Sequence, residues 1–204
     1  MSPRSMRAAA MAALLLLPAC RGKEQRAASP ADAVNRVTTR AVVLYFERAD
    51  GLLAPEMREM PLPESEAAAI HPLLSALLAG SKNAALPKPF PDGTIVRGAF
   101  VLPEGTAVVD LGGREIQEGW QTGSHAELAA AYAIVQTVVA NLSSVRRVQI
   151  LVGGEVAPTL AGHLDLTRPL RPHPDLVAGP AGREASPAAP PAAPPTTAPP
   201  AAKP

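Results

Sequence analysis

The stretch from residue 123 to residue 155 reads GSHAELAAAYAIVQTVVANLSSVRRVQILVGGE, and it predicts a long helix followed by a strand. Apolar side chains recur at a spacing typical of an amphipathic helix, at Leu128, Tyr132, Val135, Val139 and Leu142. Ser124 and Glu127 match a capping box at the start of this helix. The run VRRVQILV at 145–152 predicts a strand that turns at Gly153 and Gly154.

Upstream of this helix, the sequence predicts four strands. The run AVVLYFER at 41–48 is β-branched and aromatic, and the run MREMPL at 57–62 is a weaker strand that Pro61 confines to a sheet edge. The run TIVRGAFVLPEGTAVVDL at 94–111 predicts a hairpin around the turn Pro103-Glu104-Gly105. Alternation along a strand places Asp110 on the face opposite Val109.

A second helix is predicted within ESEAAAIHPLLSALLAGSK, residues 64–82. Its apolar residues share one helical face, namely Ile70, Leu73, Leu74, Leu77 and Leu78. Gly80 stands where the glycine just past a helix end belongs. Pro72 either kinks the helix or occupies its first helical position, and we favour the first position because the missing N–H is harmless there.

These elements define the expected fold class. The order β-β-α-β-β-α-β within residues 41–170 predicts one small α/β (α+β) domain. Each helix has a single apolar stripe, so we expect an open mixed sheet with both helices packed on one face.

The motifs in this region closely resemble those of the GerMN domain, the sporulation and spore germination domain. They follow the family order as Leu77-Leu78-Ala79-Gly80, Pro91-Asp92-Gly93-Thr94, Val108-Val109-Asp110-Leu111, Gly123-Ser124 and Val145–Gly153, with the ending GHLDLTRPL at 162–170. The resemblance covers roughly Val42 to Leu170. It implies a fold similar to the ring-building motifs of envelope assemblies and a place in secreted bacterial lipoproteins. It brings no catalytic residues, and it does not by itself imply sporulation.

The N-terminal residues predict a lipoprotein signal peptide over 1–19. Arg4 and Arg7 precede an apolar run that is far shorter than the roughly 20 residues needed to span a bilayer. Leu17-Pro18-Ala19-Cys20 resembles the bacterial lipobox, which implies cleavage between Ala19 and Cys20 and acylation of the Cys20 sulfur. The alternatives are an ordinary signal peptide with an incidental cysteine, or a buried core helix.

Lipidation at Cys20 sets the expected localisation and membrane contact. The protein would be membrane-anchored and extracytoplasmic, on the outer membrane in a two-membrane cell because Arg21 stands where an aspartate would signal retention. The chain carries a net charge of +1, and removal of two arginines with residues 1–19 leaves no basic excess. The acyl chains must therefore supply the attachment, and no nucleic-acid partner is expected.

The two ends of the chain differ in composition from the middle. Residues 20–40 are charged and lack apolar periodicity, so we expect a flexible tether. Residues 171–204 form a proline- and alanine-rich tail that we expect to be disordered and to sample polyproline II. This tail is either an unstructured terminus or a spacer or contact strip for the cell wall.

No catalytic or metal-binding pattern stands out in the sequence. The histidines at 71, 125, 163 and 173 lack metal-ligand spacing, and the single cysteine offers no partner, so no metal or other cofactor is expected. Asp110, Glu115 and Glu118 form the best candidate carboxylate set, for which a solvated or loop-capping role is favoured. Trp120, in the glycine-rich loop at 112–124, is either a plug at the core edge or an interface anchor.

Three functions are consistent with these features. The favoured one is a lipid-anchored envelope protein whose domain is a non-catalytic interaction or assembly module, binding an envelope protein or a second copy. The alternatives are an envelope hydrolase with an unrecognised site and a solute-binding lipoprotein. The hydrolase is disfavoured because no nucleophile is paired with a base in the sequence patterns. The solute-binding protein is disfavoured because one small domain lacks a two-lobed cleft.

The anchor is tested by the substitution Cys20→Ser. Because acyl chains on Cys20 would be the membrane attachment, the variant should leave the detergent phase of a Triton X-114 partition, whereas the unchanged protein should stay in it. If the variant stayed in the detergent phase as the unchanged protein does, lipidation of Cys20 would be contradicted.

Overall fold

The fold is described from a computed structural model that places residues 36–179. The predicted signal peptide, Cys20, the first part of the tether and most of the tail lie outside the described residues. In chain order the elements are β1 (Val37–Glu47), β2 (Leu53–Pro63), α2 (Glu66–Leu78), β3 (Ile95–Val101), β4 (Thr106–Gly112), α3 (Arg114–Glu118), α4 (Ser124–Asn141), β5 (Arg147–Val152) and the 3-10 helix η1 (Pro174–Leu176).

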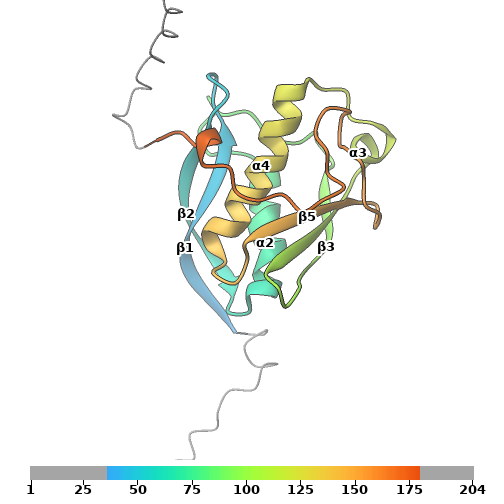
Figure 1. Cartoon of the computed structure of the whole chain (residues 1–204). Coiled ribbons are helices and arrows are strands. Elements are labelled where there is room, and N and C mark those ends of the chain that lie inside the picture. Colours follow the sequence, from blue (N-terminus) through green and yellow to red (C-terminus); the bar gives the residue numbers. More distant parts are fainter. Residues whose placement is uncertain (1–35, 180–204) are drawn as a thin grey trace, which may run out of the picture.

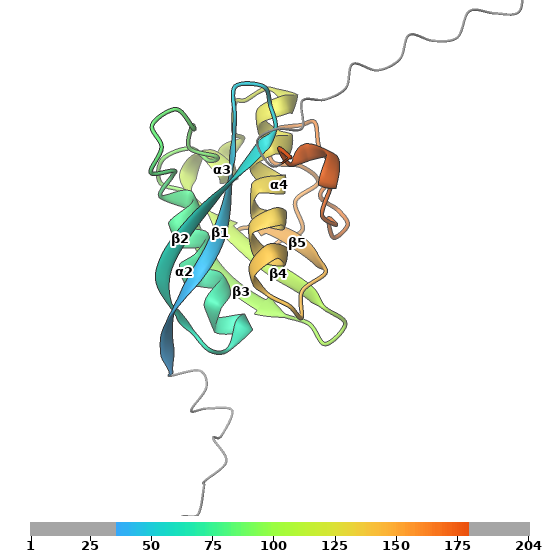
Figure 2. The same cartoon turned by 90° about the vertical axis from the view of Figure 1, so that its left-hand side faces the viewer.

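The strands form two sheets with the long helices between them (Figures 1 and 2). β3, β4 and β5 make a mixed sheet in which β3 and β4 are antiparallel and β4 and β5 are parallel. α2 and α4 cover one face of this sheet, which confirms the expected fold class. We expected one sheet, but β1 and β2 do not join the mixed sheet. They form a separate antiparallel ribbon on the other side of the helices.

Side chains of α4 explain why the ribbon stops at β1. Asn141 accepts a hydrogen bond from the Val43 N–H at 2.9 Å and donates one to the Val43 carbonyl at 2.7 Å. Thr137 accepts one from the Tyr45 N–H at 3.1 Å. These bonds occupy the edge of β1 where another strand would pair, so the helix closes that edge.

The other edge of the ribbon is limited by prolines. β2 is an edge strand, as predicted from Pro61. In the antiparallel register, Pro55 lies opposite Tyr45 and Pro61 lies opposite Thr39. The Tyr45 N–H points away from β2, and the alternation of the ladder then places both prolines toward the open edge. Their missing N–H groups weaken this edge as a template for another strand.

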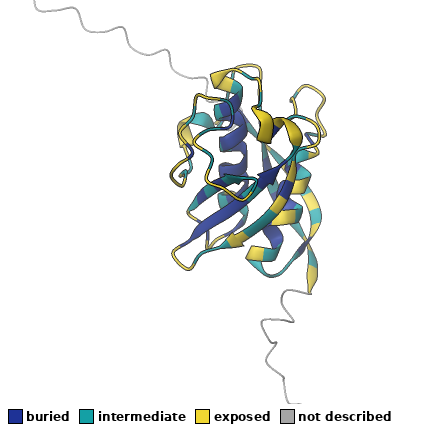
Figure 3. Cartoon of the chain, turned by 90° about the vertical axis from the view of Figure 1, so that its right-hand side faces the viewer, coloured by how far each residue is buried: buried dark blue, intermediate teal, exposed yellow. Residues whose placement is uncertain are grey.

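The helix α4 is buried on most of its circumference rather than along one stripe. Its least exposed apolar residues are Ala130, Ala131, Ala133, Ile134, Val135 and Val138. Of the predicted stripe, Leu128, Tyr132 and Val139 are only partly buried. The reason is that α4 packs on both sheets, and Figure 3 shows the buried residues gathered in the middle of the domain. No helix within residues 36–179 is both long and apolar enough to cross a membrane.

The helix α2 begins earlier than predicted. It starts at Glu66, so Pro72 lies inside the helix and not at its first position. The Glu66 carboxylate accepts hydrogen bonds from the backbone and side chains of Ser143 and Ser144, which fixes the helix start against the α4–β5 turn. Of the predicted apolar face of α2, Leu78 is partly buried, whereas the other four residues are buried as expected. Gly80 has a positive φ of 99° just past the helix end.

The domain is wider than residues 41–170 at both ends. β1 begins at Val37, four residues before the predicted strand, and its burial alternates from there. At the other end, Gln136 donates to the His173 carbonyl at 3.0 Å, and the Ala178 N–H donates to the Leu53 carbonyl at 2.9 Å. The beginning of the predicted tail therefore packs on α4 and β2.

Truncation after Leu170 tests this boundary. It removes the His173 contact with α4 and the Ala178 bond to β2, so it should cost roughly 2 kcal/mol of stability and lower the thermal midpoint by several degrees relative to a chain ending at Gly179. Equal melting temperatures for the two chains would mean that residues 171–179 contribute nothing to the packing.

Candidate functional site

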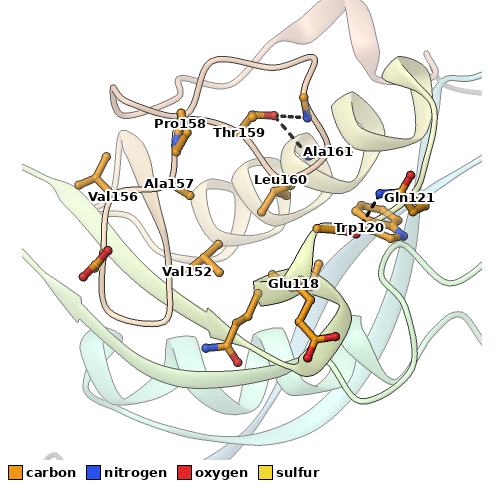
Figure 4. Close-up of a pocket in the computed structure, with 15 residues that line it drawn as sticks. Glu118, Trp120, Gln121, Val152, Val156, Ala157, Pro158, Thr159, Leu160 and Ala161 are labelled. Carbon is orange, nitrogen blue, oxygen red and sulfur yellow. Dashed lines mark hydrogen bonds between the residues drawn. The ribbon is translucent and has the colours of Figure 1, made fainter.

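Trp120 lies in a cleft between two loops (Figure 4). The cleft has a volume of about 470 Å³. One wall is α3 with the residues that follow it, and the other wall is the loop 155–162. Val152, at the end of β5, lies between the two walls in the close-up.

The first wall is shaped by a short helix that the sequence analysis did not predict. α3 is bounded by Gly113 and Gly119, whose φ angles of 136° and 108° are in a region that favours glycine. Ile116 is buried and fixes α3 to the core. α3 ends at Gly119, and Trp120 follows directly and lies beside Gln121 in the close-up (Figure 4).

The second wall starts at the turn Gly153-Gly154, as predicted from the sequence. Both glycines have positive φ, and the Val152 N–H donates to the Glu155 carbonyl at 2.9 Å. The Gly154 N–H donates to the Asp110 carboxylate at 2.8 Å. Asp110 therefore caps this turn from β4, in agreement with the loop-capping role favoured from sequence.

Glu127 holds the second wall in place. Its side chain is fully buried on α4, and one oxygen accepts hydrogen bonds from the Thr159 hydroxyl and from the N–H groups of Leu160 (2.8 Å) and Ala161 (2.9 Å). The other oxygen accepts from the His163 N–H at 2.8 Å and lies 3.1 Å from His163 Nδ1. One carboxylate thus orders the loop from Thr159 to His163.

These bonds control the charge of Glu127. Burial alone raises the pKa of its carboxyl, but the hydrogen bonds from Thr159 and from the backbone of Ala161, His163 and Leu160 outweigh burial and lower it to about 2. The group is therefore a carboxylate at neutral pH, and its charge is satisfied by donors from the loop.

The predicted capping box is wrong. Ser124 is the first residue of α4, Gly123 is the N-cap residue, and no side chain caps the helix start. Glu127 matches the local pattern but is directed to the loop 159–163 instead, because that loop offers it five donors. The sequence signal that was missed is a single acidic residue on an otherwise alanine-rich, buried helix.

Trp120 lies at the edge of the core, which agrees with the first of the two alternatives drawn from the sequence. It packs against the core as a partly buried residue, and its ring stacks on Phe90 with centroids 5.9 Å apart and an interplanar angle of 26°. Phe90 is buried and does not line the cleft. The indole thus has a firm support on one side while it lines the cleft.

The cleft lining is polar and acidic around an apolar floor. Carboxamides are supplied by Gln117 and Gln121, and carboxylates by Glu118 and Glu155. None of the lining residues is a lysine or an arginine. Glu118 forms an exposed ion pair with Arg114 at 3.0 Å, so its charge is partly compensated outside the cleft. This lining favours a neutral or cationic ligand over an anionic one.

The remaining candidate residues lie on different elements. Glu115 is exposed on α3. Asp110 is on β4, where its carboxylate caps the turn and lies 3.6 Å from Arg97. His71 contacts the Val96 carbonyl at 3.1 Å, and His125 lies 3.2 Å from Glu47. Within residues 36–179, no group of three or more His, Cys, Asp or Glu side chains converges as metal ligands.

The pair Glu127–His163 is the arrangement closest to an acid–base site. A carboxylate that orients an imidazole is a recurring part of catalytic triads. Here the five donors occupy both carboxylate oxygens. In the described part of the chain, no hydroxyl or thiol is hydrogen-bonded to the second ring nitrogen of His163. The pair therefore fixes a loop, and it lacks the nucleophile that a hydrolase of this kind needs.

Comparison with known proteins gives one family and several structural matches. The sequence profile of the Germane family, described as sporulation and spore germination, matches residues 43–157. No protein with curated annotation is significantly similar in sequence. A provisionally assigned lipoprotein from Clostridium perfringens is 17% identical, with a TM-score of 0.48 over 70% of this chain and 93% of that one.

Two further structures come from the sporulation protein GerM of Bacillus subtilis. Its tandem GerMN domains are 19% identical, with a TM-score of 0.48 over 66% of this chain and 46% of that one. Its first GerMN domain is 18% identical, with a TM-score of 0.47 over 69% of this chain and 98% of that one.

The fold and the cleft define a small α+β domain with two sheets around a pair of helices and a ligand-sized cleft at one end. The family profile covers more than half of the chain, so the protein belongs to the Germane family of sporulation and spore germination. This agrees with the resemblance drawn from the sequence motifs. The family is not a known enzyme family.

The role of Glu127 is tested by Glu127→Gln. The pKa of Glu127 is lower in the folded protein (about 2) than its ordinary 4.5, so its stabilisation is fully present above about pH 5 and is lost as the pH falls toward 2. The variant should lose on the order of 3 kcal/mol at pH 7 and show a flatter pH profile. Urea unfolding at pH 7 and pH 3 measures both effects.

The matched control is Glu118→Gln, because Glu118 is exposed and forms only a surface ion pair. It should change the free energy of unfolding little at either pH. If Glu127→Gln kept the acid dependence of the unchanged protein, Glu127 would not be the group that titrates.

Proposed function

We propose that this protein is a lipid-anchored protein of the bacterial envelope whose Germane domain docks another envelope protein through the Trp120 cleft. It acts as a non-catalytic assembly module, in sporulation and germination or in envelope assembly. The membership of the Germane family supports the sporulation-related setting. The anchor, the partner and the non-catalytic role are part of the proposal.

The observation that carries this proposal is the build of the cleft. A tryptophan that is half-buried, stacked on the buried Phe90 and placed in a cleft is the type of anchor that dominates protein interfaces. The two walls are fixed by Ile116 and by Glu127. A preformed site of this kind loses less conformational entropy when a partner binds.

The positions of the chain ends fit a docking role at a membrane. The N-terminal end of β1 lies at one end of the domain, and α3 lies toward the opposite end (Figures 1 and 2). α3 forms one wall of the cleft. Cys20 precedes residue 36 by a segment that can reach roughly 55 Å when extended. A domain tethered in this way can turn its cleft away from the membrane and toward a partner.

The attachment itself rests on Cys20. We propose cleavage after Ala19, acylation of the cysteine sulfur and, in a two-membrane cell, transfer to the outer membrane. Sucrose-gradient fractionation of membranes tests the last step, and the partition of Cys20→Ser tests the first two.

Docking is tested by photocrosslinking in cells. A photoreactive phenylalanine replaces Val156, which lines the cleft and is 54% exposed, and it should give a specific adduct with the partner. Trp120→Ala should abolish this adduct, since loss of a central anchor typically costs about 2 kcal/mol or more, roughly 30-fold in affinity. The measurement is the adduct yield at equal protein level.

Two controls make this result specific. The photoreactive group at Met57, on the exposed face of the ribbon, should give no Trp120-dependent adduct. Trp120→Phe keeps an aromatic ring against Phe90 and should keep the fold. An adduct at position 156 that survives Trp120→Ala in a folded protein would place the docking surface elsewhere.

A further inference from the structure

We propose that the Trp120 cleft binds a polyproline II strand, and that the chain's own segment 180–204 occupies it in cis. This deepens the proposed function by naming the ligand chemistry and a regulation of the same cleft. It does not depend on the membrane anchor.

The lining of the cleft offers what a proline–alanine strand needs. A polyproline II strand has no internal hydrogen bonds, so its carbonyl groups remain available as acceptors, and its proline rings pack on aromatic side chains. The cleft is lined by Trp120 and by Gln117 and Gln121, whose side-chain N–H groups can donate, although Gln121 Nε2 also donates to the Gly119 carbonyl at 3.3 Å. Proline has no N–H, so such a strand leaves few donors of its own to satisfy.

The sequence of the tail fits this chemistry. Residues 180–204 contain nine prolines and no aromatic residue. Two pairs of prolines are spaced by three residues, Pro187 with Pro190 and Pro191 with Pro194, which places the members of each pair on the same side of a polyproline II helix. No basic residue adjoins these pairs, so ring packing and carbonyl hydrogen bonds must carry the contact.

The charges are compatible with this occupant. Glu118 and Glu155 line the cleft without a lysine or an arginine beside them in the lining. The segment 180–204 carries Arg183 and Lys203 against the single acidic side chain Glu184. An acidic cleft therefore meets a segment with a small basic excess, which favours association.

The length of the segment allows binding within one molecule. The described chain ends at Gly179 in the same half of the domain as α3, as both views show (Figures 1 and 2). Eight residues lead from Gly179 to Pro187 and span up to about 28 Å when extended. A compact domain of about 140 residues has a radius of gyration near 15 Å and is therefore about 39 Å across. Pro191 follows Gly179 by 12 residues, up to about 42 Å when extended, so the second proline pair can reach the cleft.

Occupation in cis would regulate docking. A tethered segment acts at a high effective concentration, so a weak ligand is enough to fill the cleft most of the time. A partner must then displace the tail before it contacts Trp120. The tail would set the partner concentration at which docking begins.

The test uses the fluorescence of Trp120, which is the single tryptophan of the chain. The full chain with Cys20→Ser is compared with the same chain carrying Pro187→Ala, Pro190→Ala, Pro191→Ala and Pro194→Ala. The substitutions keep length and charge but remove the paired rings. We expect the substituted chain to show red-shifted emission and stronger quenching by acrylamide, with unchanged circular dichroism.

A matched control carries the same number of substitutions outside the proline pairs, at Pro195, Pro199, Pro200 and Pro204. It should keep the emission of the unsubstituted chain. A synthetic peptide of residues 180–204, added to the chain with substituted pairs, should restore the blue-shifted emission. The peptide with the same four alanines should not restore it.

Several outcomes would overturn the proposal. Identical emission and quenching for the two chains, or no response to the peptide, would mean that the tail does not enter the cleft. A shift that depended on protein concentration would mean that a tail from a second copy fills it. Crosslinking at position 156 is measured separately. Docking of the partner can therefore be confirmed while binding of the tail is contradicted, and binding of the tail can be confirmed while docking is contradicted.

Discussion

The carboxylate of Glu127 is the interaction on which the cleft depends. It is a buried charge on a central helix, and it is stable there only because the loop 159–163 turns donors toward it. The loop in turn has few regular backbone bonds of its own and takes its shape from this acceptor. The carboxylate of this one residue therefore fixes the shape of a loop that forms a wall beside Trp120.

The same helix also decides how the strands are grouped. Thr137 and Asn141 bind the backbone of β1 at the edge where a sheet would continue. α4 thus separates the β1–β2 ribbon from the mixed sheet and packs on both. Thr137 and Asn141 of this helix hold the ribbon, and Glu127 of the same helix holds the wall of the cleft. The cleft is for this reason connected to the core through α4, and not through the loops alone.

Local patterns predicted most of the elements, because alternation and helical spacing depend on neighbours along the chain. The hairpin of β3 and β4, the apolar face of α2 and the Gly153-Gly154 turn follow from such patterns. The partners of Glu127 and Asn141 lie far away in the sequence, so no local pattern identifies them. Pro72 was misplaced because the partners that start α2 at Glu66 are Ser143 and Ser144. For Trp120 the sequence left two alternatives, a plug at the core edge or an interface anchor, and it predicted no cleft.

The two ends of the described chain give the domain a mechanical axis. β1 begins at the N-terminal end of the domain, and the last described residues are bonded to the start of β2 through Ala178 and Leu53. Tension applied between the two termini would act first on the bonds that hold residues 171–179, namely Ala178 to Leu53 and His173 to Gln136. The eleven paired positions of the ribbon are not needed to hold this segment, so they would stay paired while it comes away. Under load the chain would therefore lengthen at its C-terminal end before any strand separates.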